Sequence, residues 1–215
     1  VGANIPVGAT IASVTNATTF VLSSAATGAA TGQAFTATDV SRHVTSAAFT
    51  LNAGGSTLIM GGGGEQRLTF ASLNPAGAGT LNVTGTFGTA SNRITFGTTP
   101  GLSNGLITRV TVNGDSFSTY DATNGIVAFT GFSSAQNILS ASGTATYQAT
   151  RLKANSLTGA QSINALALTS EASQVLSVGG LGGLNPATLT ISSGAILANG
   201  TGTGSTLAVP IVAFG

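Results

Sequence analysis

Charged side chains are scarce in this sequence. Only 5% of its 215 residues are Asp, Glu, Lys or Arg, whereas about a quarter are charged in an ordinary soluble domain. The net charge is +1 and the arginines are scattered, so no basic stripe is predicted for nucleic acid or anionic lipid. Acid–base and nucleophilic catalysis depend on groups that this chain hardly has, so we expect a scaffold and not an enzyme. The arginines are Arg42, Arg67, Arg93, Arg109 and Arg151.

Cysteine and tryptophan are absent, and proline is rare. Without cysteine the chain can form neither disulfides nor thiolate metal sites, and no cofactor is expected. Five prolines beside 31 glycines exclude a collagen triple helix, which needs glycine at every third position with abundant proline. No run of 18 or more residues is continuously apolar, so no membrane span is predicted.

What the sequence does contain is a succession of strand signals. Hydrophobic residues make up 42% of the chain, which favours an ordered fold over disorder. Short β-branched, Leu and aromatic runs recur between Gly and Asn clusters, and helical spacing is weak, so an all-β fold is predicted. The segment Ser162–Leu168 is interpreted as a strand because its apolar residues alternate. The other runs are Thr10–Val14, Thr19–Leu22, Thr57–Met60, Leu68–Phe70, Leu81–Val83, Ile94–Phe96, Leu106–Val112, Ile126–Phe129, Leu189–Ile191 and Leu207–Phe214.

Two of these strand runs recur at one fixed spacing. Arg-Leu-Thr-Phe at 67–70 returns as Arg-Ile-Thr-Phe at 93–96, and Leu81 is followed by Ile107, each pair 26 residues apart. A period of this length is typical of a solenoid, in which each coil buries its apolar face against the next. We therefore predict a right-handed parallel β-helix over residues 46–215, preceded by a β-hairpin unit and linker over residues 1–45. The alternative is a β-sandwich, whose strands also alternate with closely spaced turns.

Several segments resemble a known family. They are Ser91–Gly97, Pro100–Ile107, Val112–Asp121, Asn124–Thr130, Ser162–Leu168 and Ala187–Leu197. Together they resemble bacterial surface proteins built from autotransporter-associated β-strand repeats, over about Leu68 to the end. The resemblance implies a β-helix passenger displayed at the cell surface, and it brings no catalytic residues. Separately, Ile5–Leu22 is similar to a hairpin unit of long surface and fibre proteins.

The motifs that could carry chemistry are incomplete. Gly61–Leu68 approaches a calcium-binding nonapeptide, but Gln66 stands where the ligating Asp belongs. Asp115 and Asp121 could serve sugar cleavage or hold a cation, although such residues in turns more often bond their own backbone. His43 is interpreted as a surface or loop residue. No metal or catalytic site is predicted.

The expected function is structural. The end of the sequence is its most apolar run and lacks charge, so we expect it to pair with or cap a second copy, giving a homo-oligomer or filament. Its self-association residues would be Leu207, Val209, Pro210, Ile211, Val212 and Phe214. We expect an extracellular or bacterial cell-surface fibre segment. A surface adhesin that binds glycans is the alternative.

Three sequons would permit N-glycosylation in a host that performs it. They begin at Asn16, Asn82 and Asn199, each followed two residues later by Thr.

Overall fold

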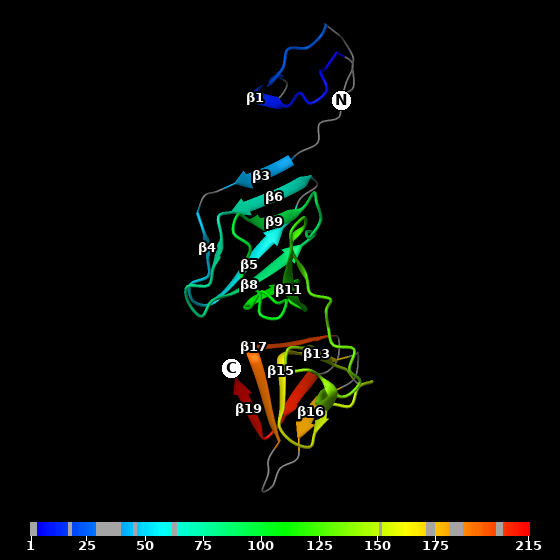
Figure 1. The fold of residues 1–215 in the computed structure, drawn as a ribbon. Helices are drawn as coiled ribbons and strands as arrows, with labels where there is room; N and C mark the ends of the chain where they lie inside the picture. The colour runs from blue at the N-terminus through cyan, green and yellow to red at the C-terminus, as the bar shows by residue number, and fades with distance from the viewer. Residues whose placement is uncertain are drawn as a thin grey trace. The chain divides into compact units, whose positions relative to one another are not determined.

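The computed structural model describes residues 4–16, 19–28, 40–44, 47–61, 64–150, 152–170, 175–180, 187–200 and 204–215. These residues form strands β1 to β19 and one short 3-10 helix, η1 (Ile138–Ser140) (Figure 1). The predicted all-β class is confirmed. The chain divides into two compact units, Val1–Val40 and Ser41–Gly215.

The first unit contains a hairpin of two short strands. β1 (Ile11–Asn16) pairs antiparallel with β2 (Thr19–Leu22), with Ile11 opposite Leu22. The hairpin lies within the segment that resembles the hairpin of fibre proteins. Its apolar side chains are poorly covered, since Ile11 is 45% and Val21 51% exposed.

The first part of the second unit builds an eight-stranded sheet in the order β3-β6-β9-β12-β11-β10-β8-β5. The pairs β5–β8, β8–β10, β6–β9 and β9–β12 are parallel, whereas β11 pairs antiparallel with both β10 and β12. This mixed sheet differs from the uniformly parallel ladder of the predicted β-helix. The strands span Val40–Val44 (β3), Gly55–Met60 (β5), Glu65–Phe70 (β6), Thr80–Gly85 (β8), Arg93–Phe96 (β9), Val110–Val112 (β10), Ser116–Asp121 (β11) and Gly125–Ala128 (β12), while β4 (Phe49–Thr50) pairs parallel with β7 (Leu73–Asn74).

The 26-residue spacing predicts one strand register correctly and another wrongly. Arg67 lies opposite Arg93 and Phe70 opposite Phe96, as the repeated tetrapeptides indicate. Leu81, however, lies opposite Val110 and not Ile107. A turn closed by the Ser103–Leu106 bridge adds residues before β10 and shifts its register. Ile107 is still buried, at 4% exposure.

A column of aromatic rings links successive strands of this part. Phe49 contacts Phe70 at 4.9 Å between ring centroids, Phe70 lies 6.1 Å from Phe96, and Phe96 lies 6.0 Å from Tyr120. The Tyr120 hydroxyl accepts a hydrogen bond from the Phe96 N–H at 3.0 Å. The column packs against a buried aliphatic core that includes Val83 and Ile94. Stacking at this spacing adds to the stability gained by burial.

The last part of the chain forms two parallel sheets. One has the order β13-β15-β17-β19 and the other β14-β16-β18, so successive strands alternate between the sheets (Figure 1). The strands span Thr146–Ala149 (β13), Ser156–Leu157 (β14), Gln161–Ser170 (β15), Val175–Gly180 (β16), Thr188–Gly200 (β17), Gly204–Ala208 (β18) and Ile211–Phe214 (β19).

β15 is buried on both faces. The interpretation of Ser162–Leu168 as a strand is confirmed, and Ile163, Leu166 and Leu168 pack into the core of the last part. On the opposite face, Ala165 and Ala167 pack against an apolar cluster that contains Phe117. The small alanine side chains thus let the core of the last part lie close to the eight-stranded sheet.

Candidate functional site

The residues predicted to self-associate lie on two strands at the edges of their sheets. β18 and β19 each have a single paired neighbour among the described residues, β16 and β17 respectively. Leu207, Val209 and Val212 are half-buried against the core. Pro210 is exposed and falls between the two strands, where it interrupts neither ladder. Ile211 and Phe214 remain 44% and 60% exposed.

Hydrogen bonding defines which backbone groups of β19 face outward. The Ile211 N–H donates to Ala187 O at 3.3 Å, and the Gly215 N–H donates to Ile191 O at 3.2 Å. Because alternate residues of a parallel strand point their backbone groups to opposite sides, the N–H groups of Val212 and Phe214 face away from β17. These outward donors form a template for another strand.

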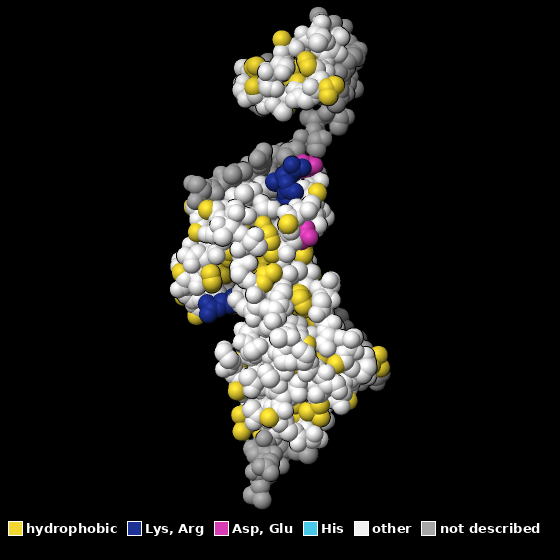
Figure 2. All heavy atoms as spheres, in the orientation of Figure 1, with side chains coloured by type: hydrophobic (Ala, Val, Ile, Leu, Met, Phe, Trp, Pro, Cys, Tyr) yellow, Lys and Arg dark blue, Asp and Glu magenta, His cyan; other side chains and the backbone are white. Residues whose placement is uncertain are grey.

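The charge that normally blocks such an edge is absent from the end of the sequence. No Asp, Glu, Lys or Arg follows Glu171. In Figure 2, neutral atoms cover most of the visible face, and cationic and anionic side chains are few. Proteins commonly protect exposed strand edges with Lys or other charges, so this edge lacks the usual barrier to strand addition.

The three sequon asparagines differ in environment. Asn82 is half-buried within β8, and its Oδ1 accepts hydrogen bonds from Thr111 Oγ1 at 3.1 Å and from the Gly114 N–H at 2.8 Å. Asn199 is half-buried near the end of β17, and its Nδ2 donates to Asp115 O. Asn16 ends β1, and its side chain lies outside the described residues. Glycosylation at these positions stays a prediction.

The two acids singled out by the sequence lie at opposite ends of β11. Asp115 precedes the strand and Asp121 ends it, which places them about 20 Å apart at a rise of ~3.3 Å per residue. Glycosidase carboxyl pairs lie within about 10 Å of each other. Asp121 Oδ1 instead accepts hydrogen bonds from the backbone N–H groups of Thr123 at 2.9 Å and Asn124 at 2.7 Å. Asp121 therefore stabilises a turn.

The remaining candidates also have structural surroundings where they are described. The Gln66 N–H donates to Asn92 Oδ1 at 2.8 Å, and the Gln66 side chain donates to Gly61 O. The side chain of His43 lies outside the described residues. Within the described part of the chain, no three His, Cys, Asp or Glu side chains gather as a metal site would require.

Tyr147 and Lys153 are the titratable pair of the last part. Lys153 Nζ lies 4.8 Å from the centre of the Tyr147 ring and donates to Ser133 O at 3.1 Å. The Tyr147 hydroxyl lies 3.3 Å from Asn155 Oδ1. Burial raises the pKa of Tyr147 and lowers the pKa of Lys153, because both charged forms lose solvation. The contacts indicate a role in packing.

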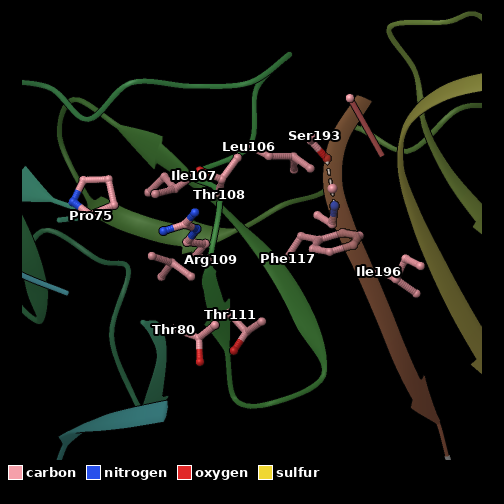
Figure 3. Close-up of a pocket in the computed structure, with 14 residues that line it drawn as sticks. Pro75, Thr80, Leu106, Ile107, Thr108, Arg109, Thr111, Phe117, Ser193 and Ile196 are labelled. Atoms are coloured by element: carbon pink, nitrogen blue, oxygen red, sulfur yellow. Dashed lines mark hydrogen bonds between the residues drawn. The ribbon is translucent and has the colours of Figure 1, made fainter. Parts of the chain in front are cut away.

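One cavity in the second unit was not predicted from the sequence. It has a volume of about 570 Å³ and is bounded by the loop before β10, by β10 and by β17. Figure 3 shows Arg109 and the threonines Thr80 and Thr111 on one side, with Ser193 and Ile196 of β17 on the other. These residues are far apart in sequence and share no motif, so nothing local marked them as neighbours.

Compared with known proteins, the chain matches no family model, no curated protein and no solved structure. Among the helices of the described residues, none is long and apolar enough to cross a membrane.

Proposed function

We propose that this chain is a structural segment of an extracellular or cell-surface fibre, and that copies add end to end through β18 and β19. The observation that carries the proposal is an uncharged double edge: two consecutive strands, each paired on one side among the described residues, with the Val212 and Phe214 N–H groups directed outward. Strand addition uses such groups for affinity and the alternating side chains for specificity.

The proposal includes a β-solenoid architecture for the second unit. Supporting it, strands β13 to β19 alternate between two parallel sheets, as the turns of a coil would. In the first part, Gly55 lies opposite Thr80 and Arg67 opposite Arg93, offsets of 25 and 26 residues. The antiparallel strand β11 would then close the first set of coils. The resemblance to autotransporter-associated repeat proteins stays a prediction, and it agrees with this architecture.

The occupant of the edge would be a second copy of this chain. The first strands of the second unit also end a sheet, since β3 and β5 are the outer strands of the eight-stranded sheet. Pairing of β18 and β19 with this other edge of the next copy joins two different surfaces. Such a heterologous contact does not close on itself and generates a filament.

A double variant, Ile211→Lys with Phe214→Pro, tests the edge. Lys introduces the missing charge, and Pro removes an outward N–H while leaving the bonds to β17 in place. Sedimentation and electron microscopy should show filaments for the unchanged chain and monomers for the variant. Leu152→Lys is the matched control, because Leu152 is 80% exposed and lies on neither sheet edge; it should assemble normally.

Ile59→Lys tests the partner side of the contact. Ile59 is 72% exposed on β5, so a charge there should also block assembly. Loss of assembly only with the Ile211 and Phe214 changes would indicate a tail-to-tail dimer and contradict a filament. An unchanged chain that stays monomeric under microscopy and sedimentation would defeat the structural proposal itself.

The adhesin alternative requires a ligand site. The described residues offer one candidate, the cavity beside Arg109.

A further inference from the structure

Two irregularities of the backbone face the same cavity. Arg109 adopts a left-handed conformation with φ of 66°, which is uncommon for a residue with a side chain. Across the cavity, β17 bulges: Ile163 pairs with Ile191 and Ala165 with Ala195, so β17 carries two extra residues in this interval. Gly194 lies in this bulge with φ of 70°. Bulges and strained residues concentrate next to functional sites.

The rest of the structure holds both irregularities in place. The Arg109 carbonyl accepts a hydrogen bond from the Leu81 N–H at 2.8 Å, which ties the strained residue to β8. In the bulge, Ser193 Oγ donates to Asn164 O at 2.6 Å. Both walls of the cavity are therefore fixed before any ligand arrives, which lowers the entropy cost of binding.

The charge of the cavity selects an anion. Arg109 is its cation, and no acidic residue is among the described residues that line it. One of the five guanidinium N–H groups donates to Gly77 O, and the others can face a ligand. A planar guanidinium matches the two oxygens of a carboxylate, with which it forms paired hydrogen bonds.

The remaining lining indicates what carries the carboxylate. Hydroxyls come from Thr80, Thr108, Thr111 and Ser193, while Ile196 offers apolar surface. A volume of about 570 Å³ is within the range of small-molecule sites. Alternating hydroxyl and apolar surface suits the hydroxyls and C–H faces of a sugar ring. We propose that this cavity binds an acidic saccharide, with Arg109 on its carboxylate and the hydroxyls on its ring oxygens.

Titration calorimetry and ligand-observed NMR with glucuronic acid test the proposal, with glucose and inorganic phosphate as comparison probes. Glucuronic acid should bind, and glucose should bind about tenfold more weakly or worse because it lacks the charge-assisted hydrogen bonds. Equal binding of glucose would overturn the role of the cation. Phosphate binding as tight as that of glucuronic acid would overturn the assignment to a saccharide.

Two variants separate binding from folding. Arg109→Gly removes the cation and suits the left-handed backbone, so it should abolish binding while the melting temperature stays level or rises. Ile196→Trp fills the cavity from a residue that is 38% exposed, and it should abolish binding while keeping Arg109. Arg93→Gln is the control, since Arg93 donates to Thr123 O outside the cavity. Undiminished binding by either cavity variant would refute the site.

The saccharide site goes beyond the structural proposal and fails independently of it. Ile211 does not line the cavity, so Ile211→Lys should block assembly yet keep glucuronic acid binding. Arg109→Gly should do the reverse.

Discussion

Asn164 offers the sharpest test of how the eight-stranded sheet is joined to the last part of the chain. Its side chain is 0% exposed. Its Oδ1 accepts hydrogen bonds from Ser103 Oγ and Asn104 Nδ2, both at 3.1 Å. Its Nδ2 donates to Ser103 O at 3.1 Å and to Thr146 Oγ1 at 3.2 Å. The amide therefore links the turn before β10 to β13 and β15, with each polar atom satisfied.

Asn164→Asp changes one atom of this arrangement. The new oxygen would replace the Nδ2 donor and face the Ser103 carbonyl, so two acceptors would repel each other around a buried charge. Leaving a buried charge without its partner costs about 3–5 kcal/mol. Urea unfolding followed by circular dichroism at neutral pH should show a loss of this size. Asn52→Asp, at an exposed position, should stay within about 0.5 kcal/mol of the unchanged protein.

Acidification provides a second readout for Asn164→Asp. Burial raises the pKa of the introduced carboxyl above its unfolded value, so the folded state binds more protons between the two pKa values. Stability relative to the unchanged protein should therefore recover as the pH falls, because a protonated carboxyl can again donate to Ser103 O. An unchanged urea midpoint at neutral pH, or a deficit that persists on acidification, would refute this account of Asn164.

Three further predictions concern other parts of the second unit. Phe70→Asp should lower the free energy of unfolding by about 3 kcal/mol in urea titrations, because it puts a charge into the aromatic column; an unchanged midpoint would contradict that packing. Gly125→Ala should unfold far more easily than the control Gly101→Ala, since an added Cβ would lie 2.0 Å from Ile94 O at Gly125 and meets nothing within 4 Å at Gly101; equal melting temperatures would refute this. The raised pKa of Tyr147 means that the unfolded chain loses its phenol proton first, so stability should fall as the pH rises above the ordinary value of 10.0. Tyr147→Phe should flatten that fall in thermal melts, and an equally steep fall would contradict it.

The sequence predicted the features that depend on local pattern. The repeated tetrapeptides identified the β6–β9 register because strands of similar length and side-chain order align when they lie side by side. The same reasoning failed for Leu81, because the turn at Ser103–Leu106 changes the length of the intervening chain without disturbing the apolar pattern around it. Periodicity therefore carries register only where the connecting turns keep their length.

The edge and the cavity differ in the same way. The uncharged apolar run at Leu207–Phe214 can be read directly from the sequence, and it lies on two edge strands. The cavity depends on Arg109 and Ser193, which come together only through the packing of β17 near β11. The irregular backbone at Arg109 has no sequence signature, because positive φ is typical of Gly or Asn and not of Arg.

The antiparallel strand β11 has a consequence for how the length of such a chain can change. Between β3 and β9, neighbouring strands meet in parallel at offsets of 25 or 26 residues, so a duplicated segment of that length would present the same side chains to both neighbours. A tandem duplication of residues 67–92 should therefore be accommodated as one additional set of strands. At β11 the direction reverses, and a similar insertion would find no matching partner. Lengthening by whole repeats is thus confined to one side of this strand, where growth leaves the ends of the sheet chemically unchanged.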